Sequence, residues 1–126
     1  MSHAHTAAPE EIRLTGKGTN LQVTFGDGCV FDLSGEYLRV HSPSAEVQGH
    51  SAAQRKTLGG KARVAIRDIL PVGHYAVRLV FDDGHDSGIF TWPYLHELGH
   101  DAPQKWAAYL MELEAKGLSR EVAGMG

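Results

Sequence analysis

The stretch YAVRLVFDDGHDSGIF, residues 75–90, decides the fold class. Its first half has apolar residues at every second position: Tyr75, Val77, Leu79 and Phe81. This alternation is typical of a β-strand with one buried face. Asp82-Asp83-Gly84 then provides the turn residues that lead the chain back toward Ile89 and Phe90. The stretch therefore predicts an antiparallel hairpin.

The chain before this hairpin repeats the same alternation. Its early apolar runs are Ile12 and Leu14, then Leu21, Val23 and Phe25, then Cys29, Phe31 and Leu33. A later run contains Val64, Ile66 and Ile69 and is followed by an expected turn at Pro71-Val72-Gly73. Gly26-Asp27-Gly28 separates two of the early runs, and glycine accepts the positive φ of a hairpin turn. We therefore expect about six short antiparallel strands, with Cys29 as a small buried residue.

Helices are predicted from capping residues and helix breakers. The expected caps are Ser34, Thr91 and Asp101, and the expected ends are Pro43, Gly99 and Gly117. This gives a short helix after the third strand and two C-terminal helices, the first of which ends near Leu98. Trp106, Leu110 and Leu113 lie at i, i+4 and i+7, which predicts one apolar face on the last helix. Strands that are followed by helices in this order indicate an α+β fold, an antiparallel sheet covered by helices.

Length and charge limit the organisation and the partners. The chain has 126 residues, which fits one domain of ordinary size. We expect a disordered lead over residues 1–10, a single domain over residues 11–117 and a flexible tail over residues 118–126. Lysine and arginine number 12 against 15 acidic residues, so the net charge is −3. Because the chain is acidic and has no basic cluster, we exclude general binding to nucleic acid or to anionic membranes.

Cysteine usage and hydropathy predict the compartment. Cys29 is the only cysteine, so no disulfide can form within the chain, as is usual in a reducing cytosol. Residues 1–9 lack the apolar run of a signal peptide. No apolar stretch reaches the roughly 20 residues that span a bilayer. We therefore expect a cytoplasmic protein, either monomeric or homodimeric.

One short motif points to an enzyme. His96-Glu97-Leu98-Gly99-His100 matches H-E-x-x-H, in which two imidazoles on one helix face bind zinc and the glutamate acts on the metal-bound water. Here a glycine separates the histidines and Asp101 is expected to begin a new helix, which places His100 in a turn. The candidate third ligands are Glu112, Glu114 and Glu121. We interpret both histidines as surface residues at a helix end and assign no catalytic residue, with a zinc hydrolase as an alternative.

Two segments contain more polar residues than the fold alone requires. They are residues 38–50, which belong in part to a predicted long surface loop over residues 42–61, and residues 82–92. Loops of this length are often functional, so we name a candidate recognition surface: Ser42, Ser44, His85, Asp86 and Trp92. For Trp92 and Phe90 the preferred interpretation is structural, as aromatic residues that anchor a helix to the sheet.

These segments carry a family resemblance. LRVHSPSAEVQGH, PVGHYAV and DDGHDSGIFTWPYLHELG occur in this order, and the chain resembles over residues 11–116 the N-terminal domain of gamma-butyrobetaine hydroxylase and trimethyllysine hydroxylase. The resemblance implies a domain that also occurs alone in bacteria and fused to P-loop ATPases that carry iron–sulfur clusters. It covers none of the catalytic iron and 2-oxoglutarate domain, so it implies no oxygenase activity.

The resemblance also implies a metal position. In the hydroxylases this domain holds structural zinc through three cysteines and one histidine, and these positions fall on Ser42, Ser44, Val47 and His85 here. Only the histidine is retained, which excludes a site of three cysteines and one histidine. A replacement site for zinc or iron would combine His85 with His41, His50 and Glu46, because imidazole and carboxylate suit both metals.

The sequence therefore predicts a non-catalytic binding or scaffold module without a cofactor. Its expected partner is another protein. The family's fusions imply a P-loop iron–sulfur carrier ATPase or a client enzyme, and a role in iron–sulfur cluster assembly or delivery. The alternative is a zinc- or iron-binding domain that uses His41, His50 and His85.

Overall fold

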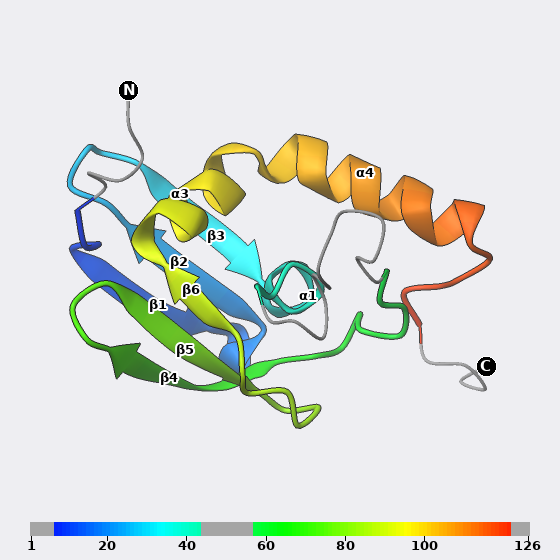
Figure 1. Ribbon diagram of the computed structural model, residues 1–126, viewed down its shortest axis with the longest axis horizontal. Helices are drawn as coiled ribbons and strands as arrows, with labels where there is room; N and C mark the ends of the chain where they lie inside the picture. Colours follow the sequence, from blue (N-terminus) through cyan, green and yellow to red (C-terminus); the bar gives the residue numbers. More distant parts are fainter. Residues whose placement is uncertain (1–6, 44–56, 122–126) are drawn as a thin grey trace.

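Two three-stranded antiparallel sheets make up the β part of the computed structural model, which describes residues 7–43 and 57–121 (Figure 1). The first sheet has the order β1 (Glu11–Thr15), β2 (Asn20–Thr24) and β3 (Val30–Ser34). The second has the order β4 (Ile66–Val72), β5 (Ala76–Phe81) and β6 (Ile89–Thr91). The helices are α1 (Gly35–Val40), α3 (Trp92–His100) and α4 (Ala102–Ala115), and a 3-10 turn, η2 (Gly16–Gly18), joins β1 to β2. The expected α+β class is confirmed, and the strands divide into two sheets.

The first sheet follows directly from the alternating pattern. β2 lies between its sequence neighbours, and Leu21 pairs with Leu33 while Val23 pairs with Phe31. Leu21 and Val23 are fully buried, because alternate residues of a strand face the same side. The early runs of the sequence therefore give both the register and the buried face.

The second sheet corrects one predicted turn. Pro71 lies inside β4, opposite Val77, and the chain turns at Gly73, which has a φ of +52°. Proline is tolerated there because β4 is an edge strand, whose outward N–H groups have no ladder partner to lose. Tyr75 precedes β5 and is 56% exposed, so the buried alternation begins one step later than the sequence pattern indicates.

The buried faces of both sheets contribute to one main core. Fully buried residues from the sheets and α3 include Leu21, Val23, Leu79, Phe90, Leu95 and Leu98. α3 lies along one side of the strands, α4 continues from it beyond the strands and above α1, and α1 lies close to the end of β3 (Figure 1). A smaller cluster of Val40, Tyr109 and Leu113 joins α1 to α4. Burial of this apolar surface is the main stabilising contribution to such a fold.

Two of the three predicted helix caps are confirmed. The backbone N–H of Tyr37 donates to Ser34 Oγ at 3.0 Å, and that of Tyr94 donates to Thr91 Oγ1 at 3.3 Å. Asp101 occupies the expected N-cap position but makes no capping bond, because its carboxylate lies 2.9 Å from His100 Nδ1. Serine and threonine at these positions satisfy backbone donors that the first helical turn leaves unpaired.

The predicted end of α3 is wrong. The helix continues through Gly99 to His100. A Cβ atom at Gly99 would collide with the ring of Phe31 on β3, so glycine serves close packing there and does not end the helix. His100 is therefore the last helical residue and does not lie in a turn.

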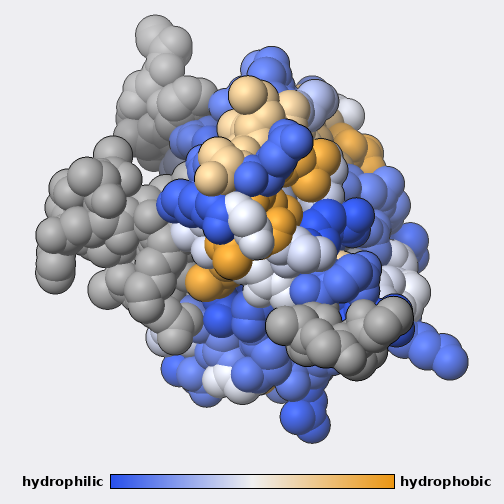
Figure 2. All heavy atoms as spheres, turned by 90° about the vertical axis from the view of Figure 1, so that its right-hand side faces the viewer, coloured by the Kyte–Doolittle hydropathy of each residue, from blue (hydrophilic) through white to orange (hydrophobic). Residues whose placement is uncertain are grey.

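The buried face of α4 also differs from the prediction. Tyr109 and Leu113 are buried, whereas Leu110 is 39% exposed. Figure 2, which faces the C-terminal end of α4, shows apolar side chains gathered among polar ones. The large apolar side chains exposed on α4 and just after it are Leu110, Met111 and Leu118. In the described part of the chain, no helix is long and apolar enough to cross a bilayer.

Residues just beyond the predicted domain end at Gly117 form hydrogen bonds with an earlier segment. The backbone N–H groups of Gly60 and Ala62 donate to the carbonyl oxygens of Ser119 and Arg120, at 2.8 and 3.0 Å. Residues 118–121 of the expected tail therefore lie against the segment that contains Gly60 and Ala62.

Candidate functional site

The position that corresponds to the hydroxylase zinc site is buried. Ser42 follows α1 and His85 lies in the β5–β6 loop, and Ser42 Oγ lies 2.9 Å from His85 Nε2. Ser42 is fully buried and His85 is 8% exposed. A Cβ atom at Gly88 would collide with Ser42 Oγ, so the loop closes tightly over this pair. The two residues are brought together as the resemblance implies, and both are buried, so the recognition surface that includes them stays a prediction.

His41 lies beside this pair and contacts α1 and α4. Its Nδ1 atom is 2.9 Å from the Tyr37 carbonyl oxygen, and its ring lies 4.7 Å from the Tyr37 ring and 6.5 Å from the Tyr109 ring. Tyr94 Oη donates a hydrogen bond to the His41 carbonyl oxygen. Ser44, Glu46, Val47 and His50 lie outside the described residues. A metal site of His41, His50, His85 and Glu46 thus stays a prediction.

Asp86 and Trp92, two further members of the expected recognition surface, differ in exposure. Asp86 is exposed. Trp92 is partly buried against the core, and its indole N–H donates to the His74 carbonyl oxygen at 2.8 Å. Phe90 is fully buried. The structural interpretation of both aromatic residues agrees with these positions.

An ion-pair network supports the loop that carries His85. Asp83 Oδ2 lies 2.8 Å from Arg39 Nε and 2.7 Å from Lys61 Nζ, and its Oδ1 accepts the backbone N–H of His85 at 3.2 Å. Burial alone would raise the Asp83 pKa, but the hydrogen bonds from Lys61 and Arg39 outweigh it and lower the pKa to about 2. Sequence reasoning identified Asp83 only as a turn residue, and the network ties α1 to the loop after β5.

The histidines of the H-E-x-x-H motif contact different partners. His96 Nε2 lies 2.9 Å from Asp27 Oδ2, whereas His100 Nδ1 lies 2.9 Å from Asp101 Oδ1. Glu97 forms an ion pair with Lys105 at 3.2 Å. Of the candidate third ligands, Glu112 accepts a hydrogen bond from Thr57 Oγ1, and Glu121 lies 3.6 Å from Arg63. Within residues 7–43 and 57–121, no group of three metal-binding side chains includes His100.

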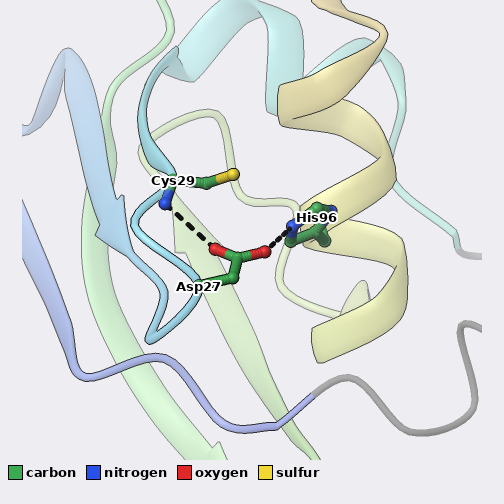
Figure 3. Close-up of side chains that lie close together, drawn as sticks. All are labelled: Asp27, Cys29 and His96. Atoms are coloured by element: carbon green, nitrogen blue, oxygen red, sulfur yellow. Dashed lines mark hydrogen bonds and ion pairs between the residues drawn. The ribbon is translucent and has the colours of Figure 1, made fainter.

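His96 instead joins a group that sequence reasoning missed. Asp27, Cys29 and His96 place one carboxylate oxygen, the thiol sulfur and one imidazole nitrogen within 4.8 Å of one another. Figure 3 shows Asp27 between the other two side chains, with the Cys29 sulfur directed toward the side of α3. The Asp27 side chain is 53% exposed and that of His96 is 19% exposed. The predicted burial of Cys29 is only partly met, because it packs against the core but remains half-buried.

Hydrogen bonds within this group shift two pKa values. The backbone N–H of Cys29 and the His96 side chain lower the pKa of Asp27, because both stabilise the carboxylate. The Asp27 side chain raises the pKa of the Cys29 thiol, since a neighbouring negative charge disfavours the thiolate, and burial adds to this effect. The thiol is thus protonated near neutral pH in the absence of a bound cation.

A pocket of about 430 Å³ lies next to α1 and is lined by an ion pair whose carboxylate is buried. Arg120 Nε and Nη2 donate to the two carboxylate oxygens of Glu36 at 2.9 and 2.8 Å, and the guanidinium lies 5.3 Å from the centre of the Trp106 ring. The Glu36 side chain is 5% exposed, whereas that of Arg120 is 46% exposed. Hydrogen bonding to Glu36 raises the Arg120 pKa. We call this the Glu36 pocket, and its other lining residues include Asn20, Asp32, Tyr37 and Ala62.

The two antiparallel sheets and the covering helices define a small α+β domain, with the Glu36 pocket beside α1. The chain belongs to the family described as gamma-butyrobetaine hydroxylase-like, N-terminal, whose family model matches residues 12–96. No curated protein matches it.

Solved structures agree with this assignment. Two proteins with NMR solution structures are similar over nearly their full lengths. The first is 44% identical with a TM-score of 0.80, and the match covers 96% of this chain and 97% of that protein. The second is 39% identical with a TM-score of 0.81, and the match covers 100% of this chain and 97% of that protein. A protein from Acidithiobacillus ferrooxidans, of unknown function and assigned to the family of domain of unknown function 971, is 41% identical with a TM-score of 0.61. That match covers 72% of this chain and 91% of the Acidithiobacillus protein.

Proposed function

We propose that this chain is a non-catalytic binding module whose Glu36 pocket takes an arginine-containing segment of a partner protein. The observation that supports this proposal is the chain's own segment around Arg120, whose guanidinium binds in the pocket. Arg120 makes a bidentate pair with Glu36 and lies over Trp106, while the backbone of Ser119 and Arg120 accepts hydrogen bonds from Gly60 and Ala62.

The chemistry of the pocket favours a guanidinium group. A planar guanidinium matches a carboxylate with two parallel hydrogen bonds and stacks on an aromatic ring, and the more compact lysine ammonium does neither as well. Glu36 is almost fully buried, so its carboxylate needs a cation or other donors beside it. Backbone donors next to the pocket add affinity without dependence on sequence, as in strand addition.

Arg120 acts in this proposal as an internal ligand that a partner must displace. Because its side chain is 46% exposed and belongs to neither core cluster, its departure should disturb little of the core. A partner can bind only those molecules whose pocket is free of Arg120. Its apparent affinity is therefore the intrinsic affinity multiplied by the free fraction. Removal of Arg120 should therefore strengthen partner binding.

The first test uses a labelled peptide with the sequence LSREV, residues 118–122, in fluorescence anisotropy. We expect the full chain carrying Arg120→Ala to bind it about 10-fold more tightly than the unchanged chain, equivalent to about 1.4 kcal/mol. Glu36→Gln should abolish the gain when combined with Arg120→Ala. A peptide with alanine in place of arginine is the matched control. Equal binding of the two peptides would contradict the proposal, and thermal unfolding of each variant checks that it is folded.

The proposed biological partner follows from the family resemblance. Relatives fused to P-loop ATPases that carry iron–sulfur clusters suggest such an ATPase, or a client enzyme, and a role in iron–sulfur cluster assembly or delivery. A cytoplasmic location fits this role and fits the free thiol of Cys29.

The partner proposal is tested by size-exclusion chromatography of the purified chain with a purified P-loop carrier ATPase. We expect co-elution that Glu36→Gln weakens and Arg120→Ala strengthens, because both changes act on the pocket. Asp86→Asn, which alters an exposed carboxylate of the β5–β6 loop, should leave co-elution unchanged. Separate elution at all concentrations would rule out this class of partner while leaving the peptide result to decide the binding chemistry.

A further inference from the structure

We propose that Asp27, Cys29 and His96 form a zinc site between the β2–β3 turn and α3. Three chemically different ligand atoms lie within 4.8 Å of one another there, and they come from segments that are about 70 residues apart in sequence (Figure 3). The site is separate from the Glu36 pocket and from the region of Ser42 and His85, so it stands independently of the proposed binding function.

The turn fixes two of the three side chains. Gly28 has a φ of +92°, its N–H donates to the Phe25 carbonyl oxygen, and the Phe25 N–H donates to the Cys29 carbonyl oxygen at 2.9 Å. The Cys29 N–H donates to Asp27 Oδ1 at 2.9 Å. These bonds close the turn so that the side chains of Asp27 and Cys29 both approach α3.

The helix fixes the third side chain. Gly99 allows α3 to pack directly on the Phe31 ring, and Tyr37 Oη donates to the Leu98 carbonyl oxygen at 2.6 Å. The His96 ring then lies between aromatic neighbours, 4.9 Å from the Phe25 ring and 5.4 Å from the Phe31 ring. An imidazole held in this way loses little conformational freedom when it binds a metal.

The ligand set favours zinc over other common cations. Magnesium and calcium take oxygen ligands, whereas thiolate and imidazole together select borderline and soft metals such as zinc. Zinc bonds of about 2.0–2.3 Å place tetrahedral ligand atoms about 3.3–3.8 Å apart. Asp27 Oδ2 and His96 Nε2 are now 2.9 Å apart, so zinc would replace their hydrogen bond after small side-chain rotations. The exposed Asp27 side leaves a fourth position for water.

The structural alternative is that Asp27 and His96 only join the turn to the helix by a hydrogen bond. The two interpretations differ in the role of Cys29. A zinc site requires its thiolate as a ligand, whereas the Asp27–His96 hydrogen bond does not involve the thiol. Cys29 is the only cysteine in the chain, so any thiolate–metal absorption must come from it.

The experiment titrates the untagged, full-length chain with cobalt(II), which reports thiolate ligands by near-ultraviolet charge-transfer absorption, and then displaces the cobalt with zinc. We expect one equivalent per monomer, and Cys29→Ser should abolish the charge-transfer band. His96→Gln and Asp27→Asn should weaken zinc binding at least about 100-fold, because loss of an outer-shell partner alone costs about 10- to 100-fold. His100→Gln is the matched control on the same helix, and it should change neither quantity, since the His100 side chain is 75% exposed and pairs with Asp101.

Several results would overturn the proposal. The first is the absence of a charge-transfer band at millimolar cobalt. The second is an equal loss of zinc affinity in His96→Gln and His100→Gln. The third is binding of half an equivalent of metal per monomer together with formation of a dimer. Binding of copper or iron without binding of zinc would also overturn it. The histidines outside α3 are present in every variant. Any weak metal binding by them therefore contributes equally to all the titrations that are compared. Circular dichroism of each variant confirms that a loss reflects the ligand and not the fold.

Discussion

Replacing Gly18 with alanine is expected to lower the free energy of unfolding by about 2–5 kcal/mol. Gly18 ends η2 and has a φ of +89°, a conformation that costs an alanine about 1–2 kcal/mol. An added Cβ would also collide with the carbonyl oxygen of Ile66 in β4. Because the colliding atom belongs to the backbone, relief requires one sheet to move relative to the other.

Gly28→Ala is the matched control for this prediction. Gly28 has a similar φ of +92°, but an added Cβ would meet nothing within 4 Å. Its substitution should cost only the conformational part, about 1–2 kcal/mol. Urea denaturation of both variants in the presence of a chelator separates strain from collision. Equal losses of stability in the two variants would show that the Gly18–Ile66 contact does not constrain the sheets.

Local chemistry explains which parts of the fold could be predicted from the sequence. Ser34 and Thr91 cap α1 and α3 through bonds to residues three positions later, so the sequence around each cap contains both partners. The β2–β3 register follows from alternation together with a short glycine turn. Such features need no knowledge of the rest of the molecule.

The sequence-based predictions are wrong where contacts between residues far apart in the sequence determine the local structure. Gly99 is a helix breaker by propensity, but the Phe31 ring makes it the residue that fits against β3. Pro71 is a turn residue by propensity, but the edge position of β4 tolerates it. Leu110 belongs to the apolar pattern of α4, yet the neighbours of the helix bury Tyr109 in its place.

The same reason limits prediction of the candidate sites. The proximity of Ser42 and His85 is predictable because the family resemblance indicates both positions. Taken singly, Cys29 suggests a core residue and His96 a surface residue, since only the packing of α3 on β3 brings them together. The Glu36–Arg120 pair joins residues 84 apart, and charge composition alone does not identify such a pair.

Asp83→Asn is expected to lower the free energy of unfolding by about 2–4 kcal/mol at pH 7, because it removes a partly buried carboxylate charge that both the Arg39 guanidinium and the Lys61 ammonium contact. The Arg39 side chain is only 6% exposed, so water cannot fully replace the lost charge. The asparagine amide has nearly the shape of the carboxylate that it replaces, and its oxygen can still accept one hydrogen bond. Asp86→Asn, at an exposed position of the same loop, should change stability by less than about 0.5 kcal/mol.

The stabilisation that Asp83 provides should depend on pH. The Asp83 pKa is about 2 in the folded protein against an ordinary value of 3.8, so between these values the unfolded chain binds more protons than the folded one. The contribution of Asp83 is therefore complete above about pH 5 and is lost as the pH falls toward 2. Partial exposure of the carboxylate reduces it to about 1–2 kcal/mol. Urea denaturation from pH 6 to pH 2 measures the free energy of unfolding of the unchanged chain and of Asp83→Asn. The difference between the two values should become smaller by about 1–2 kcal/mol as the pH falls. A constant difference across this range would mean that Asp83 stabilises the loop by shape and hydrogen bonding, and that its charge contributes nothing.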